Sequence, residues 1–222
     1  MPKWVPTYES KSRATLVSHR PWLPKVAMTP LPAAALDQLF FNAHSFGKYQ
    51  PRDVDDVLIR RLADLVKLGP TSFNSCPARF AFIKSAAGKQ RLRPHLSSGN
   101  VDKTMAAPVC VIVAADFAFS AQLPKLGLAP GRADPFAGNT AAIERTAQQN
   151  ATLQGGYLIM AARALGLDCG PMGGFNAEGV NKEFLGGTAW RAQFLCNLGY
   201  ADRSVSRARG PRLAFEEFCT VV

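Results

Sequence analysis

The sequence lacks several features that would assign it to a common class of protein. It has no run of about 18 apolar residues, so we expect no transmembrane helix and no membrane partner. Its five cysteines form no C-x-x-C pair and it has only three histidines, which argues against a metal site and a disulfide framework. Reduced, mostly buried thiols in a cytoplasmic protein are the expected state.

What the sequence does have is enough apolar material for one folded domain. The chain of 222 residues is 47% hydrophobic, which is sufficient for a sizeable core. The formal net charge of +10 raises the alternative of a nucleic-acid-binding module. That alternative is disfavoured, because the charge is dispersed and no recognition motif or interleaved aromatic pattern accompanies it.

The first 27 residues differ from the rest in composition. They contain five basic residues and one acidic residue, a contribution of +4, with scattered prolines and no periodicity. We predict a disordered basic extension over residues 1–27, followed by a single domain over residues 28–222. The extension has no apolar core of a secretory signal. It weakly resembles an organelle transit peptide, and a mis-assigned start upstream of Met28 is an equal alternative.

Periodicity predicts the main elements of the domain. Apolar residues at helical spacing predict a helix over residues 53–68, capped by Asp53, and a long helix over residues 140–165. In the long helix, we expect an apolar stripe at Leu153, Tyr157, Met160, Ala161 and Ala164 to face the core or a dimer partner. The other predictions are helices over 33–42 and 88–96, strands over 79–84, 108–115 and 192–198, and an irregular lid over 116–139.

Two segments are rich in turn-forming and polar residues. Residues 166–175 contain four glycines and one proline, which suit either a helix C-cap or a main-chain cradle for a flat ligand. Residues 71–77 hold hydroxyl and amide side chains that suit either turn chemistry or the polar edge of a ligand site. Neither segment decides between its two interpretations by itself.

Five motifs in one order over about residues 33–222 make the chain resemble the nitroreductase family of FMN enzymes. The resemblance implies an α+β fold with a mixed sheet flanked by helices, and a homodimer with FMN at the interface. The motifs are His44-Ser45, Pro70–Pro77, Asn100-Val101-Asp102-Lys103, Pro171-Met172-Gly173-Gly174-Phe175 and Arg207-Ala208-Arg209.

The resemblance implies a role for each motif in holding FMN. His44, Ser45, Arg207 and Arg209 would bind the phosphate, because guanidinium groups and hydroxyls suit a dianion. Lys103 would stabilise charge near flavin N1 and O2. The remaining expected contacts to the cofactor are from Thr71, Ser72, Asn74, Asn100, Pro171, Met172, Gly173 and Gly174. Ala43 and Cys76 depart from the family pattern, which has Arg and Gln at these positions.

Further segments resemble the RutE-type malonic semialdehyde reductase group within that family. They include G-P-T-S-x-N-x-x-P-A-R at 69–79 and A-L-G-L-D-x-G-P-M at 164–172. The likeness implies reduction of malonic semialdehyde to 3-hydroxypropanoate with NAD(P)H, a step of pyrimidine breakdown. Arg79 or Arg132 would then bind the substrate carboxylate, and no side chain is expected to act as a nucleophile.

Two points of function stay open. A broad reductase of nitroaromatics or quinones is the alternative within the same family. The sequence has no G-x-G-x-x-G fingerprint, so it does not distinguish NADH from NADPH.

Overall fold

The computed structural model describes residues 29–129, 135–205 and 208–222. Residues 32–222 form one compact unit, and the following account concerns that unit. The predicted extension over residues 1–27, and the predicted site residues Arg132 and Arg207, lie outside the described residues.

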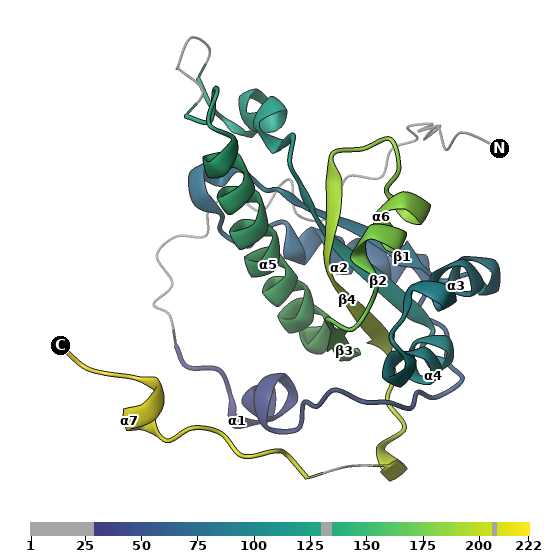
Figure 1. Ribbon diagram of the computed structural model, residues 1–222. Helices are drawn as coiled ribbons and strands as arrows, with labels where there is room; N and C mark the ends of the chain where they lie inside the picture. The colour runs from purple at the N-terminus through teal and green to yellow at the C-terminus, as the bar shows by residue number, and fades with distance from the viewer. Residues whose placement is uncertain (1–28, 130–134, 206–207) are drawn as a thin grey trace. The chain divides into compact units, whose positions relative to one another are not determined.

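The centre of the unit is a four-stranded sheet (Figure 1). Its strands are β1 (Ala78–Ile83), β2 (Val109–Asp116), β3 (Asp168–Met172) and β4 (Trp190–Gly199), in the order β1-β2-β4-β3. Neighbouring strands pair antiparallel, and an isolated bridge from Ser45 to Cys169 is parallel. The α+β prediction is confirmed, but the mixed character that we expected is limited, among the described residues, to that bridge.

Helices cover both faces of the sheet. Their bounds are α1 (Ala33–Leu36), α2 (Asp56–Val66), α3 (Ala86–Leu92), α4 (Ser98–Ala106), α5 (Thr140–Ala164), α6 (Ala177–Phe184) and α7 (Phe215–Phe218). A π-helical turn, η1 (Asp37–Phe41), continues α1, and 3₁₀ segments are η2 (Ser72–Asn74), η3 (Arg93–His95), η4 (Phe119–Leu126) and η5 (Arg203–Val205).

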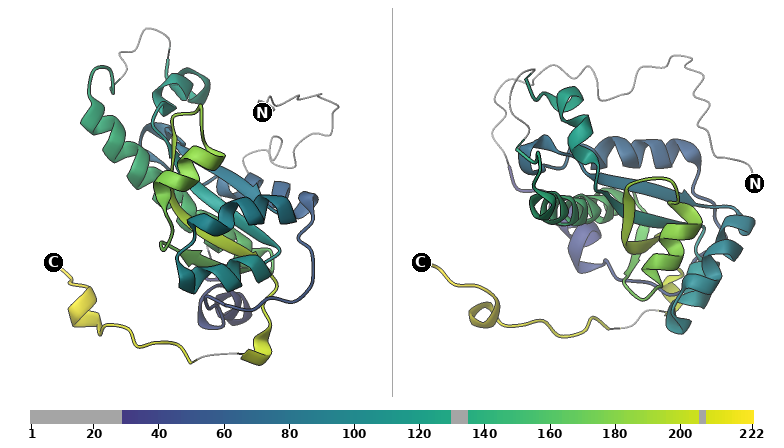
Figure 2. Two further views of the ribbon diagram at one scale, coloured as in Figure 1. Left: turned by 45° about the vertical axis from the view of Figure 1, so that its right-hand side comes forward. Right: turned by 45° about the horizontal axis from the view of Figure 1, so that its top comes forward.

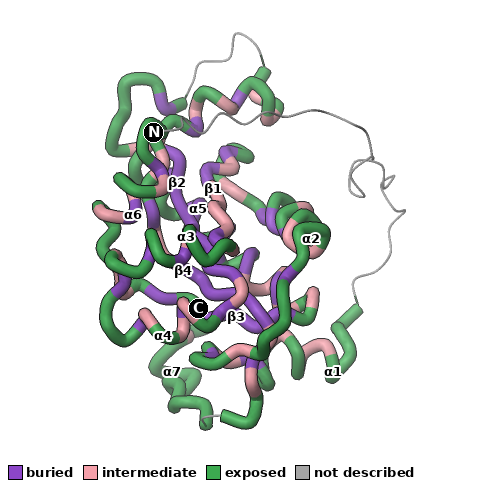
Figure 3. Tube along the Cα trace, turned by 90° about the vertical axis from the view of Figure 1, so that its right-hand side faces the viewer, coloured by how far each residue is buried: buried purple, intermediate pink, exposed green. Residues whose placement is uncertain are grey.

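The alternation of side chains along β2 divides the core into two layers. Val109, Val111 and Val113 pack with α2 and α5 on one face. Cys110 and Ile112 pack with α3 and α6 on the other face. Successive strand residues point to opposite faces, so a continuous apolar run is what a strand covered on both sides requires. Figure 2 shows α5 and α6 on opposite sides of the sheet, and Figure 3 shows β2 as buried throughout.

Helix α2 begins later than predicted, and Asp53 is not its cap. Asp55 is the N-cap, and its carboxylate accepts a hydrogen bond from the backbone N–H of Leu58 at 2.6 Å. Asp53 lies outside the helix, with its carboxylate 3.5 Å from the ammonium of Lys84. Both residues are of a type that caps helices, so the choice between them depended on where the chain turns.

The predicted stripe of α5 does not face the core along its whole length, because two of its residues are exposed, so contact with a dimer partner stays a prediction. Leu153 is 45% and Tyr157 is 39% exposed. The buried face instead carries small residues and two amides. Asn150 accepts from the backbone N–H of Ser72, and Gln154 accepts from that of Ala78, so their burial is compensated by hydrogen bonds.

The segment over residues 166–175 is only partly a loop. Its middle is strand β3, whose five residues pair with Leu195–Gly199 of β4. Gly166 has a φ of 81° and follows α5, so the predicted helix-ending turn is present. Helices α4 and α6 were also not predicted.

Candidate functional site

Two hollows lie along β3. The first has a volume of about 740 Å³, and its lining includes His44, Arg163, Asp168, Cys169 and Arg203. The second has a volume of about 410 Å³, and its lining includes Thr152, Gly156, Pro171, Met172 and Gly173. Since a strand rises about 3.4 Å per residue, the two ends of β3 are about 14 Å apart. A ligand that follows β3 through both hollows would be elongated.

Past the end of β3, the chain is held by the start of α4. The Gly174 carbonyl accepts from the side-chain amide of Asn100 at 2.7 Å and from the backbone N–H of Ser97 at 3.1 Å. A Cβ at Gly174 would lie 2.7 Å from the Asn100 amide nitrogen, so this approach requires glycine. The backbone N–H groups of Gly173 and Gly174 donate to no other described residue. Two main-chain donors therefore remain for a ligand.

Lys103 lies one turn along α4 from Asn100. Residues three apart on a helix are neighbours on its surface. The Lys103 side chain is half-buried, and within the described ranges it makes no hydrogen bond or ion pair. Helix α4 thus carries both the Lys103 ammonium, which has no partner among the described residues, and Asn100, which binds the Gly174 carbonyl.

The first hollow has basic groups around it. Ser45 forms the parallel bridge with Cys169. The half-buried His44 ring packs edge-on against the Phe46 ring, with 5.8 Å between the two ring centres. The Arg209 guanidinium donates to the carbonyls of Phe40, Phe41 and Ala43, which immediately precede His44. Arg209 therefore lies beside the segment that leads into His44 and Ser45.

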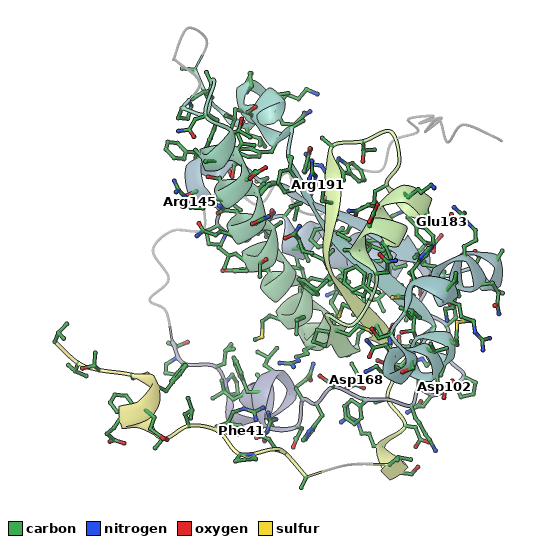
Figure 4. All side chains as sticks on the ribbon, in the orientation of Figure 1. Phe41, Asp102, Arg145, Asp168, Glu183 and Arg191 are labelled. Atoms are coloured by element: carbon green, nitrogen blue, oxygen red, sulfur yellow. The ribbon has the colours of Figure 1, made fainter. Side chains whose placement is uncertain are left out.

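Sequence reasoning did not select two arginines that line this hollow. Arg203 forms an ion pair with Asp168 at 2.8 Å, and its guanidinium lies 5.1 Å from the centre of the Phe46 ring. Arg163 donates to the Leu39 carbonyl. For Arg203 the sequence offers a signal, because it stands near Arg207, Arg209 and Arg212, whereas a single arginine within a helical pattern offers none for Arg163. Figure 4 labels Asp168, at the start of β3.

The polar segment over residues 71–77 has hydrogen bonds of its own. The Thr71 hydroxyl accepts from the backbone N–H of Cys76, and the Asn74 amide donates to the Leu126 carbonyl. Phe73, Asn74 and Cys76 have positive φ angles of 56°, 51° and 42°. Such conformations are unfavourable for residues other than glycine, and they often accompany functional sites.

This segment lies at the opposite edge of the sheet from Gly173 and Gly174. It precedes β1, whereas the glycines follow β3, and these strands are opposite edges of the sheet. Three inter-strand steps of about 4.8 Å separate the edges by about 14 Å. Within one chain, Thr71, Ser72 and Asn74 are therefore apart from Asn100 and Lys103.

Arg79 is already paired. Its guanidinium contacts the Asp116 carboxylate at 2.6 Å and donates to the carbonyls of Cys76 and Ala78. The Asp116 side chain is only 8% exposed. A carboxylate ligand at Arg79 would have to compete with this partner.

The Cys169 thiol of β3 is held in its neutral form. A hydrogen bond with Cys196 raises the pKa of Cys169, and burial raises it further. Burial likewise raises the pKa of the nearby Tyr49 hydroxyl. These groups therefore do not provide an anionic nucleophile at neutral pH. Among the described residues, no three His, Cys, Asp or Glu side chains gather as a metal site would require.

Comparison with known proteins assigns the family. The nitroreductase family model matches residues 42–200, so the chain belongs to the nitroreductase family. A protein of Ralstonia nicotianae is 52% identical over 195 residues, which are 88% of this chain and 100% of the relative. A protein of Burkholderia lata is 53% identical over 194 residues, 87% of this chain and 100% of the relative. Both are named "putative NADH dehydrogenase/NAD(P)H nitroreductase".

Solved structures support the fold. A "putative nitroreductase in complex with FMN" from Exiguobacterium sibiricum has a TM-score of 0.74 at 20% identity. The match covers 89% of this chain and 100% of that one. Within the described part of the chain, no helix has the length and hydrophobicity needed to span a bilayer.

Proposed function

We propose that this chain is an FMN-dependent NAD(P)H oxidoreductase. The observation that carries the proposal is the set of uncommitted donors at one end of β3, namely the N–H groups of Gly173 and Gly174 and the ammonium of Lys103. FMN is elongated, with a flat ring rich in heteroatoms at one end and a phosphate dianion at the other. Free donors past one end of β3 and basic groups beside its other end suit the two ends of such a molecule.

The chemistry belongs to the cofactor, and the chain supplies binding and charge. Bound FMN would supply hydride transfer between NAD(P)H and the substrate. Lys103 would lie toward N1 and O2, where its positive charge stabilises the charge of the reduced ring. Asn100 would orient the peptide after β3, and Gly173 and Gly174 would donate to the N5 and O4 edge. Pro171 and Met172 would support the ring.

At the other end, the chain would hold the phosphate. His44, Ser45, Arg207 and Arg209 are the proposed ligands. Arg209 supports this role because its guanidinium reaches the carbonyls just before His44. Ala43 offers no cation, so the phosphate depends on the others.

We also propose a homodimer in which the second copy completes the site. Thr71, Ser72 and Asn74 lie at the far edge of the sheet in their own chain, so they would reach a flavin held along β3 only from the partner. The exposed Leu153 and Tyr157 of α5 favour burial against a second copy. The homodimer therefore accounts for a polar segment whose strained backbone has no ligand within its own chain.

The proposed substrate is malonic semialdehyde, a small anionic aldehyde. Arg79 and Arg132 remain the candidates for its carboxylate, and the ion pair with Asp116 favours Arg132. Reduction of nitroaromatics or quinones is the second candidate, and the names of the two relatives favour it.

The test compares purified wild type with Lys103→Met and with Lys182→Met as a matched control. Lys182 is exposed on α6, away from β3. We expect a yellow wild-type protein that releases FMN on heating, and a more negative flavin midpoint potential in Lys103→Met alone. Steady-state kcat/KM for malonic semialdehyde, a nitroaromatic and a quinone then assigns the substrate. A wild type that binds no FMN would refute the proposal.

A further inference from the structure

A network of hydrogen-bonded, buried polar groups lies on the face of β3 and β4 that α4 covers. Asn197 of β4 is fully buried and is paired in register with Gly170 of β3. Its side-chain amide donates to the Thr104 hydroxyl at 3.2 Å, and that hydroxyl donates to the Met172 sulfur at 3.6 Å. Thr104 is also fully buried. This network of hydrogen bonds thus connects the central sheet, helix α4 and the end of β3.

This arrangement is unfavourable for stability alone. The side-chain oxygen of Asn197, Oδ1, has no hydrogen-bond partner among the described residues, and the same is true of the Tyr49 hydroxyl. Both groups flank Gly170, where a Cβ would lie 2.9 Å from the Tyr49 oxygen and 3.5 Å from the Asn197 Cβ. A buried polar atom without a partner destabilises the fold, and an apolar side chain of similar size would avoid that loss. Asn197 therefore needs an explanation other than core packing.

Helix α4 contacts the end of β3 at two points. Asn100 holds the Gly174 carbonyl, and Thr104, one turn later, contacts Met172. Lys103 lies between these two residues in the sequence of the helix. Asn197 then fixes Thr104 from the sheet side. The position of the Lys103 backbone relative to Gly173 and Gly174 is determined by these contacts.

We propose that Thr104 and Asn197 are positioning residues that hold Lys103 and residues 172–174 at the separation that a bound ring requires. The Thr104–Met172 contact is weak, because sulfur is a poor acceptor. The Asn197–Thr104 hydrogen bond is the stronger link, and its strength is increased by the low dielectric of the interior. This inference rests on the proposed function in so far as the ring is that of FMN.

The first test uses the protein without cofactor. Thr104→Val keeps the shape of the side chain but removes the hydroxyl, and Thr104→Ser restores it. Thr188→Val is the matched control, because the Thr188 hydroxyl donates to the Leu185 carbonyl in the turn between α6 and β4. We expect faster hydrogen exchange at the hydrogen-bonded amides of Phe175 and Asn176 in Thr104→Val and wild-type exchange there in the other two. Unchanged exchange in Thr104→Val would overturn the proposal.

The second test measures FMN binding and the midpoint potential. Loss of one hydrogen bond that orders the site predicts a Kd for FMN that is about fivefold higher in Thr104→Val, with a more negative potential. Met172→Leu, which keeps the volume of the side chain, is expected to shift both quantities in the same direction but less. Faster exchange with an unchanged Kd and potential would show a purely structural role and overturn the proposal. A wild type that binds no FMN would instead refute the proposed function, whatever the exchange data show.

Discussion

Two adjacent glycines of α5 offer a test of the packing on each side of that helix. A Cβ at Gly155 would lie 2.5 Å from the Phe194 ring, whereas a Cβ at Gly156 would have no heavy atom within 4 Å. Overpacking costs about 1–3 kcal/mol, and replacing a helical glycine by alanine contributes about 1 kcal/mol of stability. We therefore expect Gly155→Ala to be less stable than Gly156→Ala by about 1–3 kcal/mol.

Thermal unfolding measures this difference. For a domain of this size, 1 kcal/mol corresponds to about 2–4 °C, so the two midpoints should differ by roughly 2–12 °C. The loss in Gly155→Ala should not depend on protein concentration, because the clash lies within one chain. Equal destabilisation of both variants at every concentration would refute the reasoning.

The same pair tests the proposed homodimer. Gly156 lines the second hollow beside the exposed residues of α5, so a partner helix there would meet the added methyl group. Sedimentation should give weaker self-association for Gly156→Ala, together with a midpoint that rises with protein concentration. Unaltered self-association would place the contact between the two copies elsewhere.

Three further predictions concern the rest of the fold. Asp55→Ala should lower the free energy of unfolding by about 1 kcal/mol, whereas Asp53→Ala should leave it within about 0.5 kcal/mol, as urea unfolding can measure. Arg79→Met should destabilise the protein by about 3 kcal/mol, because it leaves the Asp116 carboxylate buried and unpaired, and adding Asp116→Leu should recover most of that loss. Burial raises the pKa of Cys110 from 9.0 to about 12, so above pH 9 the unfolded thiol loses its proton first and stability decreases with pH. In Cys110→Val, that decrease should be smaller, and an unchanged pH profile would contradict the assignment.

The strands were predictable because runs of apolar residues in the sequence indicate which segments are buried. The apolar run over 108–115 became β2, shifted by one residue, since a strand covered on both faces has no polar position. Segment 79–84 became β1, shifted by one residue in the opposite direction, and 192–198 lies within β4. In each case local composition and tertiary environment agree.

Helix α4 and strand β3 were not predictable in the same way. Strand β3 has five residues that include a glycine and a proline, so its conformation depends on pairing with β4 rather than on propensity. Helix α4 begins at Ser98-Gly99, which are poor helix formers, and its buried face uses Asn100 and Thr104. Both elements carry the proposed site, where polar residues replace the apolar ones that periodicity detects.

The partners of charged and amide side chains were equally inaccessible. Arg79 looked available for a substrate because nothing near it in the sequence reveals Asp116, 37 residues away. Asn150 and Gln154 lie outside the predicted apolar stripe of α5, yet they are buried and accept hydrogen bonds from the backbone N–H groups of Ser72 and Ala78. These long-range hydrogen bonds place two amides of α5 in the interior, which the periodicity of the sequence does not reveal.

The position of Pro171 in β3 has a consequence for solubility. Strand β3 is an edge of the sheet, and an edge with free N–H and C=O groups is a template for pairing with strands of other molecules. The bridge to Ser45 covers the first part of this edge, and Pro171, which lacks an N–H, interrupts the part beyond it. The edge formed by β3 can therefore still contact a small molecule, but it cannot pair continuously with strands of other molecules, as fibril growth would require.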